Sequence, residues 1–166
     1  MRKVNYKFKK ALITGASSGL GQEYARQLAE TGADLILVAR RRERLEDLAQ
    51  DLSGRYQVGV EVFPADLSAD EDLNRVAGKI AQTPELDLLI NNAGFGGHGQ
   101  FHLDEKGEAE QMIKVHVVAT TILTRAALPA MIARRQGAII NVASVAAFSP
   151  LSGTMYSSTK AFELMF

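Results

Sequence analysis

A tyrosine and a lysine near the end of the chain have the types and the spacing of an acid–base pair. In the run YSSTK at 156–160, the phenol of Tyr156 and the ammonium of Lys160 lie four residues apart, and therefore on one face of a helix. A neighbouring positive charge lowers the pKa of a tyrosine, which suits it to general acid–base chemistry near neutral pH. This spacing is common and carries little weight alone. It becomes specific because Ser144 follows a predicted strand, at the sheet edge where such folds bind ligands.

A glycine-rich segment, TGASSGLG at 14–21, lies between a predicted strand and a predicted helix. Glycines allow a sharp turn and a close approach of the backbone to a phosphate, and the helix N-terminus offers free N–H groups to a pyrophosphate. The spacing differs from the Gly-x-Gly-x-x-Gly fingerprint of larger dehydrogenases, and a turn that merely needs glycine is the alternative. The strand–turn–helix context favours a nucleotide. The candidate phosphate-binding residues are Gly15, Ser17, Ser18, Gly19, Leu20 and Gly21.

The end of the second predicted strand indicates which nucleotide is bound. In this kind of fold an acidic residue about 20 positions after the glycine turn holds the ribose 2′-hydroxyl, whereas an arginine accommodates a 2′-phosphate. The segment VARRR at 38–42 contains no carboxylate, and Arg40 has the matching position. We therefore predict that Arg40 binds the phosphate, which favours NADP over NAD. Arg41 and Arg42 fit the solvated start of the next helix.

The elements that must position these residues alternate along the chain. Short apolar runs predict strands at 11–14, 34–39, 58–63, 86–91 and 138–142. Helical periodicity predicts helices at 19–30, 43–52, 70–81 and 108–135, with a kink at Pro129, and a further helix from Met155. Strands that are apolar without alternation are buried on both faces. The pattern therefore predicts an α/β fold with a doubly wound parallel sheet.

Length and composition set the broad class. The chain has 166 residues, 19 basic and 19 acidic side chains, 46% hydrophobic residues and no cysteine. We expect a single dinucleotide-binding domain over 1–166. The balanced charge gives no general attraction to nucleic acid, and no stretch approaches the roughly 18 consecutive apolar residues of a membrane helix. We therefore expect a cytoplasmic protein that binds neither nucleic acid nor a membrane.

Taken together, these motifs resemble those of the short-chain dehydrogenase/reductase family, over essentially the whole chain. The matching segments are TGASSGLG at 14–21, Asp66-Leu67, NNAG at 91–94, Ser144, and Tyr156 with Lys160. The resemblance implies hydride transfer between NADP(H) and a small-molecule carbonyl or alcohol. Tyr156 would be the general acid or base, Lys160 would bind the nicotinamide ribose, and Ser144 would hydrogen-bond the substrate oxygen.

The same resemblance implies further features of fold and site. Asp66 and Leu67 would contact adenine, and Asn92, Ala93 and Gly94 would line the cofactor cleft. The fold would be Rossmann-like with strand order 3-2-1-4-5, and the full-length protein would form a homodimer or homotetramer.

Two departures from the family pattern stand out. The family usually has an asparagine on the long helix that holds a water in the proton relay, and this chain has His116 there. His116 could hold a water or relay a proton, or it could be a satisfied core histidine. The later strands and the substrate loop of the family are also missing. We expect the natural protein to be longer, and this chain to bind cofactor weakly and to turn over slowly or not at all.

Two alternative functions remain open on the sequence. The chain could be a non-catalytic nucleotide-binding pseudoenzyme or a truncated remnant, which His116 and the missing segments favour. A sugar-nucleotide epimerase fits less well, because epimerases usually differ in glycine spacing and lack an NNAG equivalent. His98 and His102 lie four apart, but in a glycine-rich loop we interpret them as solvated and predict no metal site.

Overall fold

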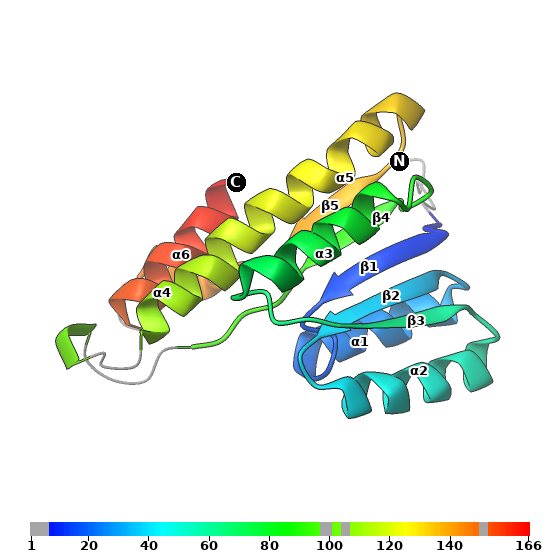
Figure 1. Ribbon diagram of the computed structural model, residues 1–166, viewed down its shortest axis with the longest axis horizontal. Helices are drawn as coiled ribbons and strands as arrows, with labels where there is room; N and C mark the ends of the chain where they lie inside the picture. Colours follow the sequence, from blue (N-terminus) through cyan, green and yellow to red (C-terminus); the bar gives the residue numbers. More distant parts are fainter. Residues whose placement is uncertain (1–6, 97–100, 104–106, 150–152) are drawn as a thin grey trace.

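The computed structural model describes residues 7–96, 101–103, 107–149 and 153–166, and it contains one parallel sheet of five strands in the order β3-β2-β1-β4-β5 (Figure 1). The strands are β1 Lys10–Thr14, β2 Asp34–Ala39, β3 Val60–Pro64, β4 Leu88–Asn91 and β5 Ala138–Asn141. The helices are α1 Gly19–Glu30, α2 Arg42–Tyr56, α3 Asp70–Ala81, α4 Glu108–Ile113, α5 Thr120–Arg134 and α6 Thr154–Met165. The predicted Rossmann-like α/β fold and its strand order are confirmed.

Successive side chains of the strands point alternately into two hydrophobic cores, one on each face of the sheet. On one face, Ala11 and Ile13 of β1 pack with the buried residues of α1 and α2. On the other, Leu12 of β1 packs with the buried residues of α3 and α5, including Val76 and Leu123. Helices therefore cover both faces (Figure 1), which is why the strands are apolar without alternation.

Four strands differ from their predicted bounds: β1 begins and β5 ends one residue earlier, and β3 and β4 each begin two residues later. β3 begins at Val60 rather than at 58 and includes Pro64, which was expected to end it. Because β3 is an edge strand, a residue without an N–H group is tolerated at its end. β4 begins at Leu88 rather than at 86. The residue before it, the buried Asp87, lies against the start of β1, where its backbone N–H donates to the Lys10 carbonyl at 3.1 Å. The Asp87 carboxylate accepts hydrogen bonds from the backbone N–H groups of Lys9 and Lys10.

The long helix is continuous from Glu108 to Arg134, but its hydrogen bonding changes in the middle. Residues Lys114–Ala119 form a π-helical segment between α4 and α5, upstream of Pro129, where the kink was expected. Segments of this kind occur often at functional sites. This one contains His116, which it carries toward α6.

The same helix is long and apolar on average, although it contains no run of 18 consecutive apolar residues. By length and composition, Glu108–Arg134 could cross a membrane, with a mean hydropathy of 1.5 in its most apolar window. One face of the helix nevertheless belongs to the core, where Ala119, Leu123 and Ala127 are buried against the sheet. This packing places one face of the helix in the core, and the cytoplasmic location stays a prediction.

Candidate active site

A cleft of about 330 Å³ lies at the carboxyl ends of the central strands. Its walls come from the segments that follow β1, β2, β3 and β4, with the start of the long helix closing one side. Ten predicted cofactor-binding residues line it: Gly15, Ser17, Ser18, Leu20, Arg40, Asp66, Leu67, Asn92, Ala93 and Gly94. Gly19 and Gly21, the other two predicted residues of the glycine turn, do not line the cleft.

The glycine turn requires glycine at two positions, Gly15 and Gly21, because a side chain at either one would be too close to its neighbours. Gly15 has a φ of +68°, and a Cβ there would lie 2.8 Å from Asn92 Nδ2. A Cβ on Gly21 would lie 2.4 Å from the carbonyl oxygen of Gly15 and 2.6 Å from Asn92 Nδ2. Helix α1 therefore begins in direct contact with the turn. Beside Gly19, the first residue of α1, the space is open, as a group approaching the helix N-terminus needs.

Thr14 ties the glycine turn to the segment after β4. Its buried Oγ1 accepts the backbone N–H groups of Asn92 and Ala93, each at 3.0 Å, and donates to the Ile90 carbonyl. Asn92 Nδ2 in turn donates to the Thr14 carbonyl at 2.9 Å. The Asn92 amide thus holds the cleft in shape. The sequence reasoning assigned Thr14 no role, although a threonine at the end of an apolar strand is a signal for such a contact.

Arg41 is exposed at the start of α2, as predicted, and it also lies in the cleft wall. Its guanidinium donates to Ser17 Oγ at 2.9 Å and to Ser18 Oγ at 2.8 Å, which bridges the glycine turn and the end of β2. Arg40 is exposed and lines the same cleft. The cleft wall after β2 therefore contains two guanidinium groups, whereas only that of Arg40 was predicted there.

Asp66 and Leu67 contribute mainly to the shape of the cleft. The Asp66 carboxylate accepts from the backbone N–H and the hydroxyl of Ser68, which forms a local turn. The Asp66 N–H donates to Asp72, and this hydrogen bond is the main reason why the pKa of Asp72 is lowered. Leu67 is largely buried in the core, so only part of it faces the cleft.

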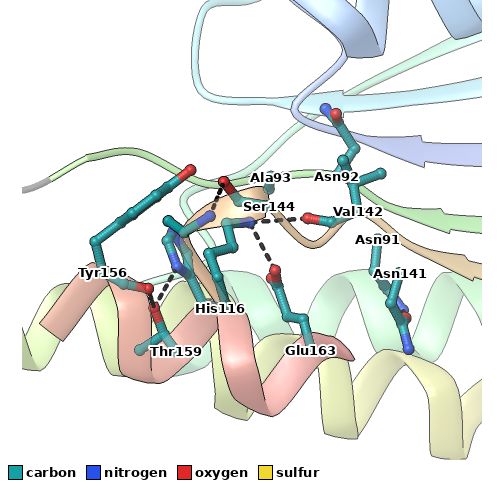
Figure 2. A network of polar contacts seen from close by, with 12 residues as sticks. Asn91, Asn92, Ala93, His116, Asn141, Val142, Ser144, Tyr156, Thr159 and Glu163 are labelled. Atoms are coloured by element: carbon teal, nitrogen blue, oxygen red, sulfur yellow. Dashed lines mark hydrogen bonds and ion pairs between the residues drawn. The ribbon is translucent and has the colours of Figure 1, made fainter. Parts of the chain in front are cut away.

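The predicted catalytic residues come together from three segments beside this cleft (Figure 2). Ser144 follows β5, and its Oγ accepts the N–H of Ala146 and so caps the short 3-10 turn Val145–Phe148. Tyr156 and Lys160 lie on α6, and the hydroxyl end of the tyrosine is directed toward the side of the strand ends where Ser144 lies (Figure 2). The Lys160 ammonium lies 5.9 Å from the centroid of the Tyr156 ring.

His116 is fully buried, and both of its ring nitrogens have protein partners. Nε2 accepts the backbone N–H of Phe95 at 3.0 Å, so the proton of the neutral ring is on Nδ1, which donates to Thr159 Oγ1 at 2.9 Å. The Thr159 hydroxyl donates onward to the Tyr156 carbonyl. Burial, aided by the charge of Lys160, lowers the pKa of His116 to about 4. The ring thus has the contacts of a satisfied core histidine, and the relay role stays a prediction.

Comparison with known proteins decides the family. The sequence model described as "short chain dehydrogenase" matches residues 9–166. The chain belongs to the short-chain dehydrogenase family. Very-long-chain 3-oxoacyl-CoA reductase-A of Danio rerio is 35% identical over 157 residues, which are 92% of this chain and 49% of the relative. An uncharacterized oxidoreductase of Staphylococcus aureus (strain USA300) is 38% identical over 156 residues, 92% of this chain and 66% of the relative.

Solved structures of family members superpose closely on this short-chain dehydrogenase. The bulky-bulky ketone specific alcohol dehydrogenase from Comamonas testosteroni has a TM-score of 0.93 at 36% identity, over 96% of this chain and 65% of that protein. The short-chain dehydrogenase from Sphingobium yanoikuyae in complex with NADPH has a TM-score of 0.92 at 40% identity, over 95% and 62%. The chain spans about half the length of the first curated relatives it matches.

The contact at Gly21 generates a prediction about stability. In the variant Gly21→Ala the new methyl group must displace the Gly15 backbone, which we expect to lower the free energy of unfolding by about 1–3 kcal/mol in urea denaturation. Gly78→Ala is the matched control, because Gly78 lies within α3 with open space beside it and should gain up to about 1 kcal/mol. Equal effects of the two substitutions would show that the turn does not require glycine at 21.

The buried imidazole generates a prediction about pH. Because the pKa of His116 falls from 6.5 to about 4 on folding, the unfolded chain binds more protons between these two values. This group should therefore remove about 3 kcal/mol from the free energy of unfolding as the pH falls from 6.5 to 4. In His116→Asn that contribution is absent. Urea titrations of both proteins at several pH values measure the difference, and a difference that does not change with pH contradicts the prediction.

Proposed function

We propose that this short-chain dehydrogenase is an NADP(H)-dependent oxidoreductase that interconverts a carbonyl and a secondary alcohol by hydride transfer, with Tyr156 as general acid and base. The observation that carries the proposal is that the Tyr156 hydroxyl is directed toward Ser144 (Figure 2), while Lys160 Nζ lies beside Gly94, a residue that lines the cleft. A nucleotide-binding protein without chemistry has no need of a phenol and a buried ammonium at that edge.

The cleft suits a dinucleotide phosphate. The turn at Gly15 and Gly21 is packed as closely as glycine allows, and the free N–H groups of α1 begin beside open space at Gly19. Arg40 and Arg41 form the wall after β2, where a 2′-phosphate would be held by charge-assisted hydrogen bonds. Support also comes from relatives described with NADPH, among them L-sorbose reductase from Gluconobacter frateurii, which is 35% identical.

The side chains divide the chemistry between them. Bound NADP(H) would supply or accept the hydride. In reduction, the Tyr156 phenol would give its proton to the carbonyl oxygen as that oxygen gains charge, and in oxidation the phenolate would remove the alcohol proton. The Lys160 ammonium lies 5.9 Å from the centroid of the Tyr156 ring. Ser144 would donate its hydroxyl proton to the substrate oxygen, since its Oγ already accepts the Ala146 N–H.

The contacts of His116 favour a second function, nucleotide binding without turnover. Both nitrogens of His116 are occupied by protein groups, so the ring has no free nitrogen for the relay water that the family asparagine holds. A protein that binds the nucleotide without turnover would tolerate this arrangement. The cofactor and the tyrosine can be tested separately, which distinguishes the two functions.

The two arginines generate a prediction about the cofactor. NADPH should bind saturably and more tightly than NADH, as followed by nicotinamide fluorescence. Arg40→Asp and Arg41→Asp should each weaken NADPH binding by about tenfold to a hundredfold, with less effect on NADH, because each removes a charged partner of the 2′-phosphate. Arg42→Asp is the control with the same charge change, since Arg42 pairs with Glu46 outside the cleft lining. Equal losses in all three variants would mean that only net charge matters.

The tyrosine generates a prediction about turnover. With a panel of ketones and NADPH, Tyr156→Phe should lower kcat by about a hundredfold or more, because the proton donor is lost. NADPH binding should change little, since the ring remains. Native turnover in the variant would contradict the acid–base role, and saturable NADPH binding without turnover in the parent chain would favour the binding protein.

A further inference from the structure

Glu163 is a buried carboxylate that the proposed function does not use. It lies on α6 one turn after Lys160, and its side chain is 1% exposed, against 6% for that of Lys160. Its Oε2 lies 2.6 Å from Lys160 Nζ (Figure 2). Burial of an ionised carboxylate is costly unless the group is paired. The position of this acid therefore needs an explanation in terms of the lysine.

The surroundings of Lys160 identify Glu163 as its counter-charge. Besides Glu163, Nζ donates to the Val142 carbonyl at 2.9 Å, at the end of β5. This carbonyl orients the ammonium but carries no net charge. His116, which approaches from the π-helical segment, is neutral near pH 7 because its pKa is lowered to about 4, in part by Lys160 itself. Glu163 thus supplies the negative charge in contact with the buried ammonium.

We propose that Glu163 is a positioning residue, which holds the Lys160 ammonium charged against the end of β5 and sets how much of that charge reaches Tyr156. The proposal rests on the proposed function, in which Lys160 and Tyr156 take part in hydride and proton transfer. Glu163 itself contacts neither Tyr156 nor the cleft among the contacts of the described residues. It acts through Lys160.

A pH experiment on the Lys160–Glu163 pair also responds to the other titratable and charged groups around it. Tyr156 is on the same helix, and His116 and Lys114 are on the π-helical segment that packs against it. The α4 helix, which also packs on α6, carries Glu108 and Glu110, whereas Val145–Phe148 carries no titratable side chain. Burial raises the pKa of Glu163, and the hydrogen bond from Lys160 opposes that rise. Glu163 therefore loses its charge on acidification before an exposed glutamate does.

The experiment measures the pKa of Lys160 directly, in the chain without cofactor. Carbon-13 NMR of the lysine Cε atoms follows each ammonium, and Lys160→Met identifies the resonance of Lys160. In Glu163→Gln, which keeps the size and loses the charge, the pKa of Lys160 should fall by about one unit or more, a tenfold loss of proton affinity. Glu46→Gln is the control, because Glu46 pairs with Arg42 on the exposed face of α2 and should leave Lys160 unchanged. A Lys160 pKa that is the same in parent and Glu163→Gln overturns the proposal.

A second variant and the parent chain cover the case in which Glu163→Gln does not fold. Glu163→Asp keeps the charge and should retain most of the parent pKa of Lys160. In the parent chain, the Lys160 resonance should also show a second step on acidification, when Glu163 takes up its proton. The absence of this step, or an Asp variant that behaves like Gln, overturns the proposal.

The same variants separate this inference from the proposed function. If NADPH binds and ketones are reduced, Glu163→Gln should shift the pH profile of kcat while NADPH affinity changes less than threefold, whereas a purely structural role would lower activity equally at every pH. If NADPH does not bind, the proposed function fails, and the Lys160 titration still decides whether Glu163 holds the ammonium.

Discussion

The site depends on the close contact between the glycine turn and the segment after β4. Gly21, at the start of α1, lies so near the Gly15 carbonyl that a methyl group has no room, and Thr14 and Asn92 hydrogen-bond across the same junction. This contact sets where the N-terminus of α1 points. It also sets the path of the Asn92–Gly96 segment, on which the neighbouring side chains depend.

From that segment a chain of hydrogen bonds leads to α6. The Phe95 N–H binds His116, His116 binds Thr159, and Thr159 binds the carbonyl of Tyr156. Gly94 is part of the same packing, because a Cβ there would lie 2.9 Å from His116 Nε2 and 3.3 Å from Lys160 Nζ. A neutral, fixed imidazole thus connects the segment after β4 to α6. This connection explains why a fully buried polar ring is tolerated on the long helix.

Electrostatics in this region follows from burial. His116 and the ion pair of Lys160 with Glu163 lie out of water within one cluster. The charge of Lys160 contributes to the lowered pKa of His116 and opposes the rise that burial causes in the pKa of Glu163. The Tyr156 phenol, half-buried beside them, faces a lysine whose charge is partly balanced. The proton chemistry proposed for Tyr156 therefore depends on the entire cluster as well as on the Tyr–Lys spacing.

The sequence by itself determined the fold, and it predicted ten of the residues that line the cleft. Helices at 19–30 and 70–81 were predicted to the residue, because their apolar period and flanking residues are local properties. Only the tertiary structure decided which groups Arg41, Glu163 and His116 contact. A guanidinium that reaches Ser17, a carboxylate that is buried rather than solvated, and a tautomer set by Phe95 all depend on segments distant in sequence. Periodicity shows which helix face a residue occupies, but its solvation and its partners are set by what packs against that face.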